Sequence, residues 1–106
     1  MSWIALYLAG ALEVVWASAM KASNGFTQPA FSALTAVAAF ASFWLLALAM
    51  KGLPLGTAYA VWVGIGALGA FAVGILFMDE SVSPLRLGSA GLILIGLVGL
   101  KLSEGA

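Results

Sequence analysis

The 106-residue chain is 64% hydrophobic and 8% charged, with a mean hydropathy of +1.17. Soluble globular proteins carry roughly 25% charged residues, so this composition predicts an integral membrane protein and excludes a soluble enzyme. The absence of His and Cys removes imidazole and thiol chemistry, disulfides and the usual zinc, haem and iron–sulfur ligands, and we expect neither a metal nor a cofactor. The formal net charge is zero, so the sequence lacks the excess of basic residues that is typical of nucleic-acid-binding proteins.

Three breaks rich in turn-forming residues, at 21–29, 51–56 and 79–84, divide the chain into four apolar segments. They predict helices near 3–20, 30–50, 57–78 and 85–102, each long enough to cross a hydrocarbon core of about 30 Å. Such short connections force neighbouring helices to run antiparallel. We therefore expect one all-α domain over residues 1–106, a compact four-transmembrane-helix bundle.

The first segment contains a single charged residue, Glu13. Eighteen residues at 1.5 Å each make a helix of about 27 Å, which puts Glu13 slightly past mid-membrane. A charged side chain at that depth costs about 2.5–3.5 kcal/mol, so it is a functional candidate by default. The alternative is a protonated side chain in an interhelical hydrogen bond. A cleaved secretory signal is the poorer explanation, because no Lys or Arg precedes the run and Glu13 interrupts it.

Other residues with a candidate role follow from helical spacing. Gly10 and Trp16 lie one turn either side of Glu13, where Gly10 would open room and Trp16 would belong to the site or to an interfacial aromatic belt. In the second segment Ser42 lies near mid-depth among small residues, as a site hydroxyl or a helix contact. In the third, Tyr59 and Trp62 share a face and are either site or belt residues.

Two further features concern conformation and assembly. Gly64 and Gly66 are predicted to form a hinge in the third helix, unless they simply allow close helix approach. In the fourth helix one face combines small and bulky residues, and we assign it to dimer packing. Its members are Gly88, Leu92, Ile95 and Gly99. Lys101 near the end of this helix is typical of an anchor that reaches the interface.

The positive charges do not specify an orientation. Lys21 and Arg86 lie on one side of the membrane and Lys51 and Lys101 on the other, a two-against-two count under the rule that Lys and Arg favour the cytoplasm. This balance indicates insertion in both orientations (dual topology) and an antiparallel homodimer, unless weaker cues set the orientation. From helix depth we expect Trp62 to reach the leaflet of Trp16 only from an inverted partner.

Three stretches carry a family resemblance: residues 10–17 (GALEVVWA), 21–27 (KASNGFT) and 56–66 (GTAYAVWVGIG). Through them the chain resembles the small multidrug resistance transporters over essentially its full length. The Trp-Ala pair at 16–17 is similar to the guanidinium-exporter subtype, where the multidrug subtype tends to carry Gly-Thr. Val63 and the Ala-rich second segment depart from the family pattern.

The resemblance implies an antiparallel homodimer in the bacterial inner membrane that exchanges protons for guanidinium or small guanidinyl compounds. It implies Glu13 as the shared proton and cation site, with a hydrogen-bonding surround from Trp16, Ser42 and Trp62. Tyr59 would be a gating phenol, and Lys101 would join the polar network.

Chemistry supports a planar cation, because guanidinium donors match a carboxylate bidentately and its face stacks on aromatic rings. One rival is a multidrug-type proton antiporter for quaternary ammonium and lipophilic cations. A rival of another class is a non-transporting membrane assembly subunit whose glutamate only stabilises helix contacts. A membrane enzyme is disfavoured, because the membrane-spanning segments offer one acidic side chain and no convincing nucleophile to act with it.

Overall fold

The computed structural model describes residues 2–103. It contains four α-helices: α1 (Ser2–Ala22), α2 (Pro29–Ala49), α3 (Leu55–Phe77) and α4 (Pro84–Ser103). Every helix end lies within two residues of its predicted position, and all four helices are long and apolar enough to cross a membrane. The described part of the chain has no strand, so the prediction of an all-α membrane protein is confirmed.

The helices begin where local chemistry favours a start. Pro29 and Pro84 occupy first helical positions, where the missing N–H would have no helical partner and the fixed φ suits the helix. Pro54 flanks the start of α3 in an extended conformation. Ser83 caps α4, because its Oγ accepts a 3.2 Å hydrogen bond from the backbone N–H of Arg86.

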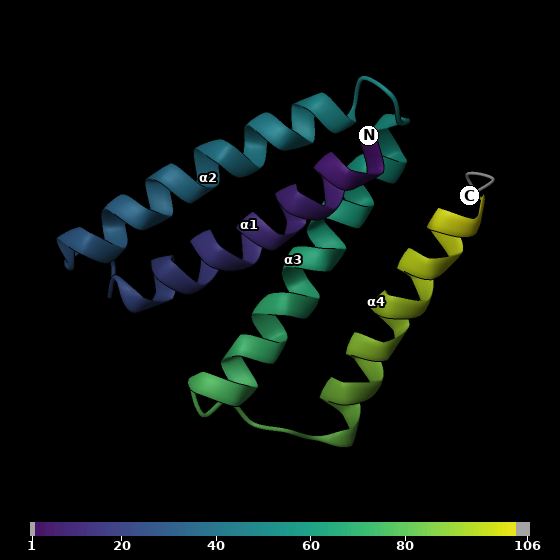
Figure 1. Ribbon diagram of the computed structural model, residues 1–106. Coiled ribbons are helices and arrows are strands. Elements are labelled where there is room, and N and C mark those ends of the chain that lie inside the picture. Colours follow the sequence, from purple (N-terminus) through teal and green to yellow (C-terminus); the bar gives the residue numbers. More distant parts are fainter. Residues whose placement is uncertain (1, 104–106) are drawn as a thin grey trace.

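The α1–α2 connection is a tight turn built around Ser23. The Ser23 hydroxyl is fully buried, donates to the Met20 carbonyl at 2.6 Å and accepts from the Phe26 backbone N–H at 3.0 Å. Asn24, Gly25 and Phe26 all have positive φ, a conformation that Asn and Gly adopt readily. The turn therefore returns the chain within a few residues, and α2 runs antiparallel beside α1 (Figure 1).

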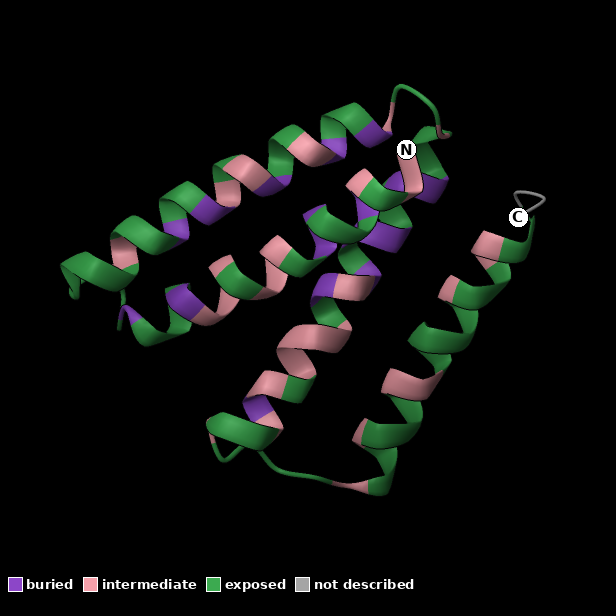
Figure 2. Ribbon diagram, in the orientation of Figure 1, coloured by how far each residue is buried: buried purple, intermediate pink, exposed green. Residues whose placement is uncertain are grey.

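The buried core lies where α1 meets α2 and α3. In Figure 1 α1 and α2 run side by side and α3 crosses α1, and the buried segments in Figure 2 gather at that junction. The cluster of buried apolar side chains draws on all three helices: Leu6, Ala9, Leu46, Ala49, Ala58, Val61 and Trp62. Three of these seven residues are alanines, which allow the close backbone approach through which membrane helices associate.

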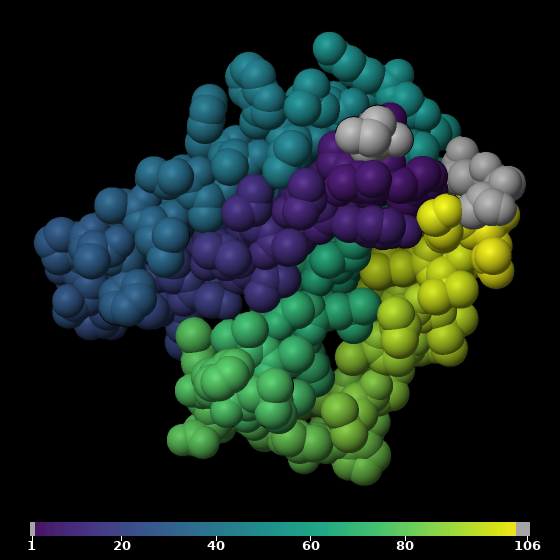
Figure 3. Space-filling model, in the orientation of Figure 1, coloured from purple at the N-terminus to yellow at the C-terminus, as the bar shows by residue number. Residues whose placement is uncertain are grey.

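The fourth helix departs from the predicted compact bundle. Among the described helices its backbone approaches only that of α3, and none of its residues is buried. Figure 2 shows it exposed or intermediate throughout, and Figure 3 shows it, in yellow, along one edge of the molecule. Lipid tails solvate an apolar helix as well as another helix does, so a single subunit has little reason to enclose α4.

Candidate functional site

The carboxyl group of Glu13 lies against the backbone of Gly66 on α3. A Cβ atom added to Gly66 would overlap the Glu13 carboxyl, so only glycine leaves space for it there. Glu13 is the twelfth residue of the 21-residue helix α1, about 17 Å along a helix of about 31 Å. An ionisable group is thus held at mid-span in contact with a second helix.

Gly10 packs closely against α3. It is buried, and a Cβ added to it would come within 2.7 Å of the Ile65 side chain on α3. Gly10 therefore makes room for Ile65, whereas Gly66 makes room for Glu13. Packing thus explains Gly10 in this conformation, and the expectation that it opens space beside the carboxylate stays a prediction.

Ser42 and Trp62 form a buried hydrogen-bond chain across three helices. The Trp62 indole N–H donates to Ser42 Oγ at 2.9 Å, and the Ser42 hydroxyl donates to the Ala9 carbonyl at 2.6 Å. Ser42 is fully buried and Trp62 is 7% exposed. The chain satisfies both polar groups and fixes α2 and α3 against α1. Ser42 therefore makes a helix contact, which was its alternative role, and the buried Trp62 is not a belt residue in this subunit.

Aromatic rings extend from this chain toward Glu13. Phe43 contacts Trp62 with ring centroids 5.7 Å apart and Trp16 with centroids 6.3 Å apart, both edge-on. Tyr59 packs on Trp62 at 5.6 Å and is half exposed. Within one subunit Phe43 thus contacts both indoles, and the approach of Trp62 to Trp16 of an inverted partner stays a prediction.

Two polar atoms at the centre of this arrangement have no partner. Neither Glu13 Oε1 nor Trp16 Nε1 finds a hydrogen bond among the described residues, and both atoms are buried. Buried polar groups are normally satisfied, and each exception calls for an explanation. One carboxylate acceptor and one indole donor are therefore left unpaired among the described residues.

The predicted hinge glycines both lie at close helix contacts. Gly66 contacts Glu13, and a Cβ added to Gly64 would come within 2.6 Å of the Leu97 side chain on α4. The α3 helix runs without a break through both positions. Packing thus explains both glycines in this conformation, and a hinge stays a prediction.

Lys101 lies apart from Glu13 in this subunit. Its ammonium group stands 4.7 Å from the centroid of the Trp3 ring, about 15 Å along α1 from Glu13. Trp3 and Lys101 both line a cavity of about 270 Å³ between α1, α3 and α4. This is a cation–π contact, and it does not bring Lys101 into the polar network that the resemblance implied.

The predicted dimer-packing face of α4 points away from the other helices. All four of its residues are exposed, Leu92 at 71% and Ile95 at 68%. No heavy atom counted as a neighbour stands within 4 Å of a Cβ added at Gly88 or Gly99. The dimer-packing face of α4 is therefore available to another helix.

Among residues 2–103 no group of three acidic side chains could hold a metal ion.

Comparisons with known proteins identify the relatives of this chain. The family described as Small Multidrug Resistance protein matches residues 1–98. The chain is 55% identical over 103 residues to the guanidinium exporter of Escherichia coli (strain K12), covering 97% of this chain and 98% of that protein. It is 56% identical over 103 residues to the guanidinium exporters of Citrobacter freundii and Salmonella typhimurium, with the same coverage.

The family match, the bacterial relatives and the four helices together indicate a multi-pass protein of the bacterial inner membrane. Over essentially its whole length, the chain belongs to the small multidrug resistance family of membrane transporters.

Proposed function

We propose that this chain is a proton-coupled antiporter that exports guanidinium or small guanidinyl compounds, and is not an enzyme. The observation that supports it best is the Glu13 carboxyl, which is held at mid-span with one buried oxygen unpaired among the described residues. The naming of its relatives as guanidinium exporters supports the same substrate.

The proposed binding chemistry follows from the groups around Glu13. Guanidinium is planar and presents paired N–H donors that suit both oxygens of one carboxylate. Trp16 lies one turn from Glu13 and edge-on to Phe43, so an aromatic surface is available for the face of the cation. A quaternary ammonium ion has no N–H donor, which favours guanidinium over the substrates of a multidrug-type antiporter.

The other proposed site residues would act around this carboxylate. Ser42 and Trp62 hold each other through their 2.9 Å hydrogen bond and would position the aromatic wall. Tyr59, half exposed against Trp62, would contribute a mobile phenol at the edge of the site.

The proposed working unit is an antiparallel homodimer. A single subunit leaves α4 exposed with one face available, and membrane helices pair through such close-packing surfaces. Two inverted subunits would place two Glu13 carboxylates in one shared site. The balance of Lys and Arg between the two sides supports insertion in both orientations.

Coupling would arise because a proton and guanidinium compete for the same carboxylates. If the dimer rearranges readily only when it carries one or the other, a pH gradient drives the cation in the opposite direction. For each proton exchanged, one pH unit supplies about 1.4 kcal/mol. That free energy corresponds to about tenfold accumulation of guanidinium.

Purified protein in liposomes tests this proposal. With an acidic interior, we expect radiolabelled guanidinium to accumulate about tenfold per pH unit for one-for-one exchange, and we expect little uptake without the gradient. Tetraethylammonium serves as the parallel substrate, because uptake of that cation alone would indicate the multidrug-type activity. A complete lack of pH-sensitive cation flux would favour the non-transporting assembly subunit instead.

A further inference from the structure

A second carboxyl group packs against a glycine on the same face of α3. A Cβ added to Gly74 would overlap the carboxyl of Glu80, just as one added to Gly66 would overlap that of Glu13. Gly66 and Gly74 are eight residues apart, about two helical turns or 12 Å. The same side of α3 thus carries one acid at mid-span and another at its loop end.

A small cavity lies between these two acids. It has a volume of about 150 Å³, and its walls come from both α1 and α3. On the inner side it is lined by Ala17 and Ala70, which stand one turn beyond Glu13 and Gly66 respectively. On the outer side it is lined by Glu80 and Lys21. Its volume is enough for a cation of a few heavy atoms, and Glu80 is its acidic wall.

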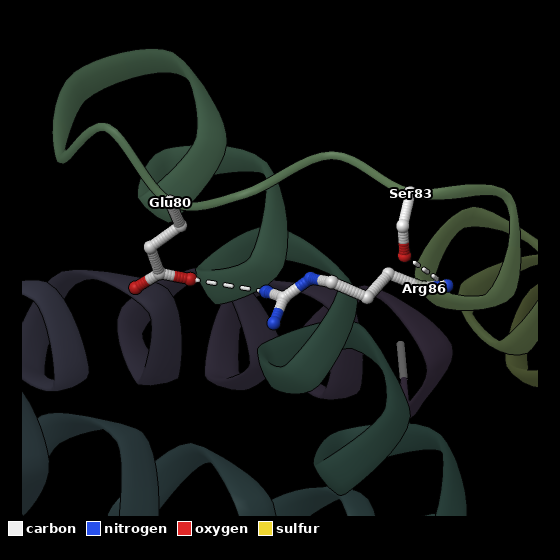
Figure 4. A network of polar contacts seen from close by, with 3 residues as sticks. All are labelled: Glu80, Ser83 and Arg86. Carbon is white, nitrogen blue, oxygen red and sulfur yellow. Dashed lines mark hydrogen bonds and ion pairs between the residues drawn. The ribbon is translucent and has the colours of Figure 1, made fainter.

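In this structure the partner of Glu80 is itself a guanidinium group. The Arg86 Nη2 atom lies 3.3 Å from Glu80 Oε1, and the Arg86 guanidinium carbon lies 4.8 Å from the centroid of the Phe71 ring. Figure 4 shows the two side chains pointing toward each other from the loop and from the start of α4. A carboxylate and an aromatic ring here hold the chemical group that the proposed substrate carries.

This ion pair is weak enough to exchange. The two side chains are 39% and 42% exposed and share one long contact, and exposed pairs contribute little to stability. The buried Arg86 Nε has no hydrogen-bond partner among the described residues, so Glu80 does not bind the guanidinium group through both Nε and Nη2. A competing cation could therefore displace Arg86 from Glu80 at little cost in free energy.

We propose that Glu80 is an outer cation-recruiting carboxylate, which binds guanidinium at the cavity mouth before the cation moves inward to Glu13. This inference rests on the proposed function and adds a second residue to the substrate path. Arg86 occupies Glu80 between transport events and is displaced by the incoming cation. Lys21 at the same mouth keeps the binding weak, and a transport path needs sites that a substrate can leave.

The competing explanation is a structural clamp, in which the ion pair only fixes α4 against the end of α3. The two explanations predict different directions for the change in KM when Arg86 is replaced. A clamp is broken equally by loss of either partner, so Glu80→Gln and Arg86→Gln would act in the same direction. A recruiting site loses its acid in the first variant but loses its internal competitor in the second.

The test is the concentration dependence of guanidinium uptake in proteoliposomes. We expect Glu80→Gln to raise KM about two- to fivefold, with a smaller change in the maximal rate, and Arg86→Gln to lower KM by a similar factor. Asp79→Asn is the matched control, because it removes an acid from the same loop and Asn tolerates the positive φ of this position. Its KM should match that of the wild type.

Changes of KM in the same direction for both variants would overturn the inference in favour of the clamp. If Glu80→Gln fails to assemble, Arg86→Gln alone decides, since a raised or unchanged KM in that variant contradicts recruitment. Wild-type protein without guanidinium uptake would instead overturn the proposed function, and this inference with it. Normal pH-driven uptake in both variants with unchanged KM would remove Glu80 from the path and leave Glu13 as proposed.

Discussion

Replacing Glu13 by Gln is expected to abolish guanidinium uptake driven by a pH gradient. Gln has nearly the shape of Glu and fits the space that Gly66 provides, but it can neither ionise nor carry the exchanged proton. Removing one partner of a buried charge pair costs about 2–5 kcal/mol, so guanidinium affinity should fall at least about thirtyfold. Initial uptake rates and equilibrium binding in detergent measure the two effects.

Asp79→Asn provides the control for this substitution, since it removes one negative charge from an exposed loop residue. Its uptake should equal that of the wild type, and both variants should elute from a sizing column as the wild-type assembly does. Proton-coupled uptake that persists in Glu13→Gln would refute the proposed role of Glu13 as the exchange site.

Replacing Gly66 by Ala is expected to lower guanidinium affinity about fivefold or more while the protein still assembles. The new Cβ would overlap the Glu13 carboxyl and must push it out of position. Overpacking of this kind costs about 1–3 kcal/mol, and here it falls on the binding group itself. Equilibrium binding of guanidinium by calorimetry measures the loss, and uptake at saturating guanidinium measures the exchange rate separately.

Gly64→Ala distinguishes this explanation from a hinge. Its Cβ would meet the flexible end of Leu97, so we expect its affinity to stay within about twofold of the wild type. Glu13→Asp in the Gly66→Ala background should recover part of the lost affinity, because the shorter acid leaves room for the methyl group. Slow exchange with normal affinity in both alanine variants would favour the hinge and contradict the packing explanation.

The helical layout could be predicted because each boundary carries its own chemistry. Pro29 and Pro84 start their helices, and the turn after α1 uses Asn24 and Gly25 where φ must be positive. Between these points the chain is apolar over a membrane's thickness. Local rules and the bilayer dimension therefore agree, and they place every helix end to within two residues.

The contacts inside the site depend on how helices lie beside one another, which helical periodicity does not specify. Spacing along α1 favoured Gly10 as the neighbour of Glu13, but the rotation of α3 brings Gly66 there instead. Phe43 follows Ser42 directly in sequence, and its contacts with Trp16 and Trp62 arise only when α2 packs against α1 and α3. An aromatic residue next to a mid-span serine was the available clue.

The position of α4 could not be predicted for a different reason. Its apolar stripe indicates a packing surface without specifying the partner, and a short loop alone gave the expectation of a compact bundle. In lipid no hydrophobic force drives such a helix onto its own subunit. The exposed face of α4 is therefore compatible with the proposed homodimer, in which a second subunit would cover it.

Hydrogen ions and guanidinium are proposed to occupy Glu13 in turn, and proton release on binding is the sharpest check of this competition. Guanidinium is added to weakly buffered, detergent-solubilised protein over a series of pH values, while a pH indicator and calorimetry follow the same sample. Competition at Glu13 requires that wild-type protein releases protons as it binds, with affinity that weakens as the pH falls, and that Glu13→Gln releases none. Guanidinium binding without proton release at any pH would contradict it.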